Sequence, residues 1–355
     1  MFATKLIPVA ACALLLAGPV HAASSWQEAN KASVALMVEG KLQPAFDLAW
    51  QAAELYEKAP NYKPSNHERL LLNAADIFLQ IQNPAKTPEM LQKALTAIGR
   101  HVPEGAPETI ALNEQLAKSY LALGDKAKAK LIYERVATLY EKNYGADSVG
   151  SVNAQLELVR TAKAARDAAT AQRYLDRIDG LTKSLPADHP IRLQVEFEQA
   201  MGAIDAGRDS AAGAQLRSIV RQARASENVA MRSLARDAYG MLAFIAQREG
   251  DPQTEDRMVE ATRGLPQHAG GPQPLFRSIP ESIESGLTGS ATMELRVSTA
   301  DGKVKEVRVL ESSGDPKYVS VMTKSILNWR FQPTATEGSA GSLVTVRQSV
   351  SNAAS

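Results

Sequence analysis

Cysteine is almost absent from this sequence, and histidine is scarce. The single cysteine is Cys12, near the start of the chain, and there are 5 histidines. One cysteine cannot form an internal disulfide or a metal site made of several thiolates. No histidine stands three or four residues from a second ligand in a pattern typical of a metal site. We therefore expect no disulfide, no metal ion and no cofactor.

An excess of positive charge, the mark of many nucleic-acid-binding proteins, is also missing. The 40 basic and 39 acidic residues leave a net charge of +1, which gives no electrostatic reason for a nucleic-acid partner. The sequence lacks a phosphate-binding glycine loop, a dinucleotide fingerprint and a serine-hydrolase elbow. Its acids and bases are scattered, so we nominate no catalytic residue, and we expect neither an enzyme nor a small-molecule substrate.

The first 22 residues predict a signal peptide. Lys5 precedes a mostly apolar run, Leu6 to Val20, and Val20, His21 and Ala22 form a small-x-small cleavage site. Cleavage there would start the mature protein at Ala23. Two alternatives stay open, an uncleaved membrane anchor and a lipoprotein cleavage site ending at Cys12.

Residues 25–265 predict an array of about six helical pairs. With 45% hydrophobic residues over 355 positions, the chain can bury more than one core, and its length favours two or more domains. Helix-ending residues recur every 41 to 43 positions in this stretch, at Gly40, Asn83, Gly124, Arg166, Gly207 and Gly250. Regular punctuation of this kind indicates stacked pairs of antiparallel helices, with a turn residue that leaves helical φ and ψ.

The third repeat resembles the tetratricopeptide (TPR) motif. Its matching residues are Tyr120, Gly124, Ala129, Tyr133 and Val136. Ala129 lies five residues after its turn, and Ala45, Ala171 and Ala212 stand at the same offset, whereas Pro88 and Glu255 depart from alanine there. The segment from Tyr144 to Ser148 resembles the longer TPR variety of kinesin light chains. The resemblance implies a solenoid whose concave side binds proteins.

Residues 266–280 are rich in proline and glycine, which predicts a linker. Beyond it, Met293, Leu295 and Val297 alternate with polar residues before the pair Asp301 and Gly302, and a second apolar run extends from Val304 to Leu310. An Asp-Gly pair between such runs predicts a β-hairpin. A short amphipathic helix follows, with Tyr318, Met322 and Ile326 on one face.

This order resembles the C-terminal domain of the TonB family over about residues 272–350. The residues that carry the resemblance are the turn Asp301 and Gly302, the loop Ser312 to Gly314, the signature Trp329, Arg330, Phe331 and Pro333, and, less closely, the lead-in Pro272 to Phe276. The resemblance implies a small antiparallel sheet with one helix at residues 281–350. The expected fold is thus multidomain, an all-α TPR-like solenoid followed by an α+β TonB C-terminal-like domain.

The candidate partner-binding residues lie on the last two extended segments of this domain. We expect Trp329 and Phe331 to pack on the helix, and Arg330, between them, to be accessible. The last strand, Leu343 to Val350, is expected at the sheet edge, where an added strand could pair with it. The candidates are Arg330, Leu343, Val344, Thr345, Val346 and Arg347. The alternative is that this strand only completes the sheet, with Thr345 and Arg347 blunting its edge.

The combined hypothesis is a periplasmic adaptor that binds proteins. The resemblance implies outer-membrane TonB-dependent transporters as partners, or else envelope assembly factors, and a homodimer is left open. The first alternative is a membrane-anchored energy transducer of the TonB type, which is at odds with the cleavable leader and with the helical array in place of a proline-rich spacer. A remote alternative is an envelope enzyme, which would need a cluster of titratable groups in a pocket.

Overall fold

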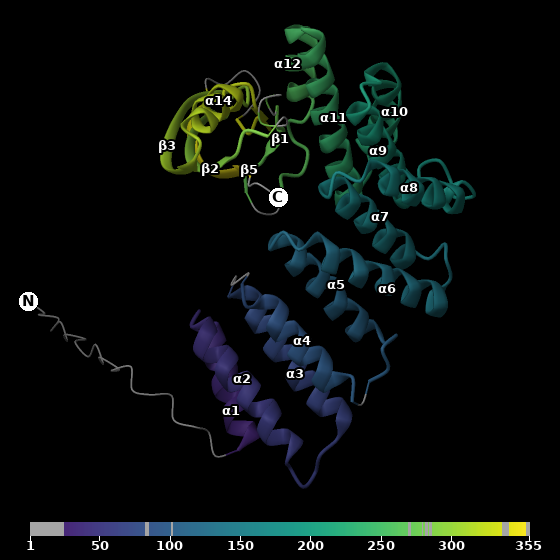
Figure 1. Cartoon of the computed structure of the whole chain (residues 1–355), viewed down its shortest axis with the longest axis vertical. Coiled ribbons are helices and arrows are strands. Elements are labelled where there is room, and N and C mark those ends of the chain that lie inside the picture. The colour runs from purple at the N-terminus through teal and green to yellow at the C-terminus, as the bar shows by residue number, and fades with distance from the viewer. Residues whose placement is uncertain are drawn as a thin grey trace, which may run out of the picture. The chain divides into compact units, whose positions relative to one another are not determined.

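In the computed structural model the chain forms two compact units, residues 1–168 and 169–355. Figure 1 labels helices and strands of both. The structure describes residues 25–81, 85–100, 102–268, 271–278, 280, 283, 286–335 and 341–352. The predicted signal peptide and Asn83 lie outside the described residues. No helix within the described part is both long and apolar enough to cross a membrane.

The first unit consists of helices, each packed on the next along the chain. Side-chain caps fix several of the starts: Asp125 accepts the backbone N–H of Lys128, and Ser148 accepts that of Ser151. The helices are α1 (Trp26–Val38), α2 (Leu42–Glu57), α3 (Pro64–Gln80), α4 (Thr87–Ile98), α5 (Pro107–Ala122), α6 (Lys126–Tyr144) and α7 (Val149–Ala164).

The second unit continues the helical series and ends in the small sheet. Helices α9 to α12 again pack on their neighbours in sequence. The elements are α8 (Ala168–Thr182), α9 (Pro190–Asp205), α10 (Asp209–Ala223), α11 (Val229–Glu249), α12 (Pro252–Glu260), β1 (Pro274–Phe276), β2 (Gly289–Ser298), β3 (Val304–Gly314), α14 (Pro316–Ile326), β4 (Arg330–Phe331) and β5 (Leu343–Asn352).

The turns of the helical series confirm the TPR-like pattern. Gly40, Gly124, Gly207 and Gly250 take φ between 71° and 80°, and Arg166 takes φ 59°. A left-handed residue at this place ends the first helix of a pair and reverses the chain. The alanines five residues after the turns, Ala45, Ala129, Ala171 and Ala212, are at most 3% exposed. The helical part is therefore a TPR-like array.

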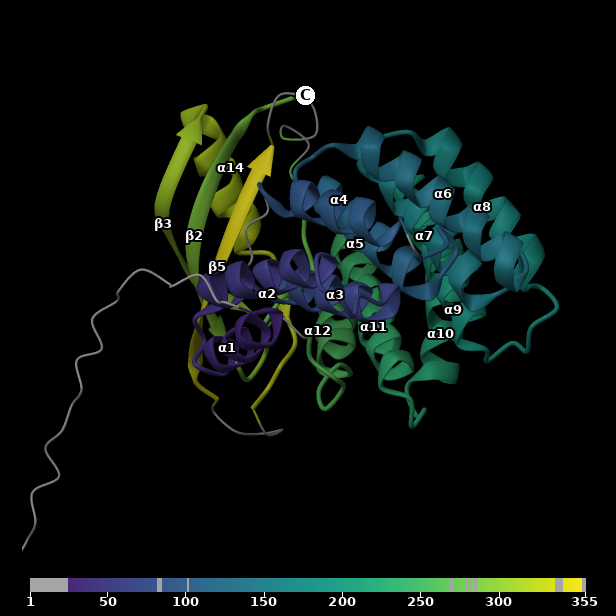
Figure 2. The ribbon, with the colours of Figure 1, turned by 90° about the horizontal axis from the view of Figure 1, so that it is seen from below.

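The C-terminal sheet is antiparallel with strand order β3-β2-β5 (Figure 2). Its hairpin β2–β3 confirms the predicted Asp301–Gly302 turn, and Gly302 takes φ 67°. Helix α14 covers one face, where Tyr318, Met322 and Ile326 are buried as expected. The predicted loop at Ser312 to Gly314 is wrong, because these residues extend β3 and pair with Gly289 to Ala291.

A second, two-stranded sheet joins β1 to β4. The end of the proline- and glycine-rich stretch is thus a strand, with Leu275 and Phe276 buried against α11. Trp329 and Phe331 are 1% and 2% exposed, which confirms that both side chains enter the core. The predicted boundary between domains at residue 265 stays a prediction.

Candidate functional site

Strand β5 forms one edge of the three-stranded sheet, as predicted, and pairs with β2 without a bulge. Thr299 N–H donates to the Ser342 carbonyl. In an antiparallel ladder the pairs that exchange hydrogen bonds alternate with pairs that do not. Counting by twos from Ser342, the backbone groups of Thr345 and Arg347 face away from β2. Among the described residues, none pairs with this outer side of β5.

The side chains along β5 divide by face. Leu343 and Val344 are 41% and 37% exposed, so this edge presents apolar surface at its start. Thr345 and Arg347 are exposed on the outer face of the sheet. Val346, in contrast, is 6% exposed and packs in the core. Its backbone helps to shape the edge, but its side chain points into the core and would not contact an added strand.

The opposite edge, β3, is less suited to pairing. Its exposed side chains include Lys305, Glu306 and Arg308, and Arg308 forms an ion pair with Glu294 at 2.9 Å. Charged side chains on an edge strand discourage the addition of a further strand. Strand β5, which begins with apolar residues, is therefore the edge better suited to pairing with an added strand.

The prediction that Arg330 is accessible is wrong. Its side chain is 11% exposed, and its guanidinium lies 2.7 Å from the Glu255 carboxylate and 3.5 Å from that of Asp256, both on α12. Burial raises the pKa of Glu255 above its ordinary value, and the Arg330 guanidinium opposes that shift. We call this pair the Glu255–Arg330 clasp. Arg330 therefore holds the sheet to the helical array and does not face a partner.

An ion pair and several neutral contacts accompany the clasp, and the ion pair joins Lys303 to Asp256 at 3.1 Å. Gln332 Nε2 donates to the carbonyls of Thr262 and Leu265 at 2.8 and 2.7 Å. The rings of Phe244 on α11 and Phe276 on β1 lie 5.5 Å apart. Strands β1 and β4 thus cover the apolar face of the last helical pair, which would otherwise be exposed to solvent at the end of a solenoid.

One signal in the sequence pointed to this contact. Glu255 stands five residues after its turn, where four other repeats have a buried alanine, and it is 5% exposed. A carboxylate at a position that is buried in the other repeats needs a cationic partner. Neither the repeat pattern nor the TonB resemblance says which cation that is, so Arg330 was expected to be accessible and its contact with Glu255 was not predicted.

A hollow of about 500 Å³ in the first unit bears on the enzyme alternative, because His67 and three glutamates line it. His67 Nδ1 lies 3.4 Å from the Tyr62 hydroxyl. Each glutamate has another partner: Trp50 donates to Glu54 at 2.9 Å, and Arg100 and Lys93 pair with Glu57 and Glu89 at 2.5 and 2.8 Å. These contacts are those of a solvated, ion-paired groove. Within the described chain, no group of three or more potential ligands could hold a metal ion.

No protein-family model matches this sequence, and no curated protein matches it. Solved structures do resemble the chain. A kinesin light chain of Podosopora anserina with nearly identical TPR-like repeats is 22% identical, over 56% of this chain and 94% of that one, with a TM-score of 0.43. BtubC (BKLC) from P. vanneervenii is 15% identical, over 62% and 89%, with a TM-score of 0.49. The pilF protein of Pseudomonas aeruginosa is 13% identical, over 66% and 88%, with a TM-score of 0.40.

Proposed function

We propose that this chain is a protein-binding adaptor whose TPR-like array binds one protein while the β5 edge takes an extended strand from another. The observation that carries the proposal is the outer side of β5, where the backbone of Thr345 and Arg347 is turned away from the sheet beside the exposed Leu343 and Val344. Backbone groups of an edge strand give an incoming peptide its affinity, and neighbouring side chains give it specificity. Neither part requires a cofactor or a catalytic group.

The finer proposal is that the C-terminal sheet is TonB-like and acts in the periplasm. The hairpin, the single helix, the buried Trp329 and Phe331 and the final edge strand support this reading. The partners would then be outer-membrane transporters or envelope assembly factors. A membrane-anchored transducer remains the alternative, and the mature N-terminus separates the two: Ala23 supports the exported adaptor, and Met1 supports the anchored form.

The test uses the two edges of the same sheet. A photo-crosslinking residue replaces Leu343 on β5 in one variant and Val309 on β3 in another, because both side chains are exposed, at 41% and 38%. We expect a protein to be cross-linked at position 343 in intact cells and not at position 309.

The second arm adds Thr345→Pro to the position-343 probe. Proline removes an N–H that faces outward, so the ladder with β2 keeps its bonds while an added strand loses one. We expect the cross-link to be lost, and Thr345→Val, which keeps the N–H, to retain it. Equal cross-linking with proline and valine would show that the partner does not bind by strand addition.

A further inference from the structure

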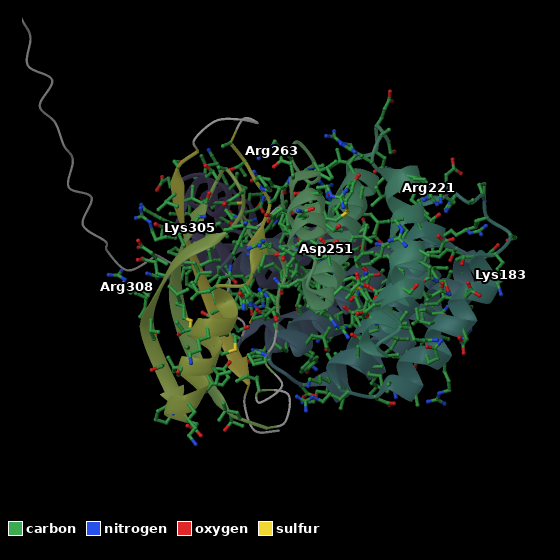
Figure 3. All side chains as sticks on the ribbon, turned by 90° about the horizontal axis from the view of Figure 1, so that it is seen from above. Lys183, Arg221, Asp251, Arg263, Lys305 and Arg308 are labelled. Carbon is green, nitrogen blue, oxygen red and sulfur yellow. The ribbon has the colours of Figure 1, made fainter. Side chains whose placement is uncertain are left out.

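The second helix of the fifth repeat, α10, and its C-cap Arg224 carry a row of arginines that no part of the proposed function uses. Arg217, Arg221 and Arg224 are exposed and spaced by four and three residues, which places them on one face of a helix over about 10 Å. Figure 3 labels Arg221 on this helix. The one acidic residue of α10 is Asp209, at its start, and it pairs with Arg248 at 3.4 Å.

The row ends at a hollow of about 450 Å³ that further arginines line. Arg224 donates to the Tyr239 hydroxyl at 3.2 Å, and Arg232 donates to the Gly264 carbonyl at 2.9 Å. Both acceptors are neutral, so neither guanidinium has its charge compensated by these bonds. Arg263, labelled in Figure 3, also lines the hollow, but Glu260 pairs with it. Among the described residues that line the hollow, Glu227 is the one carboxylate.

We propose that this surface, Arg217, Arg221, Arg224 and Arg232, binds an acidic segment of a partner protein. One carboxylate of the segment would occupy the hollow between Arg224 and Arg232, and further carboxylates would lie along α10. Guanidinium groups suit this role because their planar fork binds a carboxylate through two parallel hydrogen bonds. The chain as a whole is nearly neutral. Against that background, these four exposed or half-buried arginines, which form no ion pair with an acidic residue in the part of the chain that the structure describes, give a locally positive surface.

Two other anionic partners fit the surface less well. A helix that binds a membrane must insert an apolar face, whereas Leu216, Ile219 and Ala223 of α10 are fully buried in the core of the array. Single-stranded nucleic acid binds on exposed aromatic rings that stack with bases. The described residues that line this hollow include no aromatic ring. Tyr239, which Arg224 contacts, is 7% exposed, and the Arg224 guanidinium lies 5.7 Å from the centre of its ring.

The probe is a short fluorescent peptide of alternating glutamate and serine, titrated with the full-length protein and followed by fluorescence anisotropy. We expect Arg217→Gln, Arg221→Gln and Arg224→Gln together to weaken binding about tenfold or more, since each exposed ion pair contributes modestly and three are lost. Added salt should weaken wild-type binding and have little effect on the variant. The corresponding lysine variant should lie between the two, because it keeps the charge and loses the fork.

The matched control is Lys126→Gln, Lys128→Gln and Lys130→Gln on α6, the second helix of the third repeat. It removes the same charge, but Lys128 and Lys130 already pair with Asp125 and Glu134, at 2.9 and 3.9 Å. We expect the control to bind like the wild type. Equal weakening in both variants would overturn the proposal, since binding would then follow net charge alone.

Two parallel measurements decide the class of ligand. The same proteins are mixed with vesicles containing phosphatidylglycerol and with inorganic phosphate. Binding to vesicles or phosphate without binding to the peptide would overturn the assignment to an acidic protein segment. Circular dichroism of each variant checks that the exposed substitutions leave the fold intact. The outcome is independent of strand capture at β5, which involves neither α10 nor the hollow.

Discussion

The third and sixth repeats use the same position for different purposes. Ala129 and Glu255 both stand five residues after a turn, and both are buried, at 0% and 5% exposed. In the third repeat the small side chain lets two helices approach closely. In the sixth, the carboxylate receives Arg330 from the sheet at 2.7 Å. At this position the last repeat thus has a contact with strand β4 in place of the close helix packing seen in the third repeat.

The largest effect should come from restoring the repeat pattern with Glu255→Ala. Alanine fits the position elsewhere in the array, but here it would leave the largely buried Arg330 without its nearest carboxylate. Removing one member of a buried ion pair costs about 3 to 5 kcal/mol, and we expect the lower end because Asp256 lies 3.5 Å from the same guanidinium. Urea unfolding followed by circular dichroism measures the loss.

A double variant distinguishes the loss of the ion pair from the cost of leaving one charged side chain without its partner. Glu255→Leu with Arg330→Met replaces both charges by apolar groups, and such replacements are often neutral. We therefore expect the double variant to be more stable than Glu255→Ala alone. If Glu255→Ala is as stable as the wild type, the clasp contributes nothing to stability. The difference between the two repeats at this position would then have no energetic consequence.

A smaller effect should distinguish a glycine that contacts the sheet from one that does not. A Cβ at Gly240 of α11 would lie 2.9 Å from the Leu275 carbonyl oxygen, whereas nothing lies within 4 Å of the same atom at Gly202 of α9. Gly240→Ala must push β1 away, at a cost of about 1 to 3 kcal/mol. Gly202→Ala should instead raise stability by up to about 1 kcal/mol, through helix propensity.

Thermal melting of the two alanine variants supplies the comparison. Shifts of opposite sign would support close packing of β1 on the array. A stabilising shift in both variants would contradict it, because the last repeat would then tolerate a methyl group where β1 is placed.

The periodic elements could be predicted from the sequence because their signals are local. Turn residues that leave helical φ, such as Gly124 and Gly207, and the Asp301–Gly302 hairpin are determined by steric rules within a few residues. The end of β3 was missed because Ser312 to Gly314 read as turn residues, while pairing with β2 keeps them extended. A cross-strand partner overrides local preference there.

The candidate site was predictable only in part, for the same reason. The edge position of β5 follows from the order of elements, and Thr345 and Arg347 are exposed as alternation requires. Alternation along the strand also places the Arg330 side chain on the face of its sheet that points away from the core. It does not show which element packs on that face. Helix α12 covers it, and such a long-range contact has no local signature beyond the unexpected carboxylate at Glu255.

The smallest effect concerns the turn that lacks glycine. Arg166 has φ 59°, whereas the glycines at the equivalent turns have φ between 71° and 80°, and a side chain in this conformation costs about 1 to 2 kcal/mol. We expect Arg166→Gly to raise stability by about 0.5 to 1 kcal/mol, since glycine's greater freedom in the unfolded chain offsets part of the gain. Gly207→Ala is the reverse control and should destabilise the protein. If Arg166→Gly lowers the urea midpoint, the arginine side chain contributes a contact that outweighs its backbone strain, and the fourth turn differs from the others in more than its residue type.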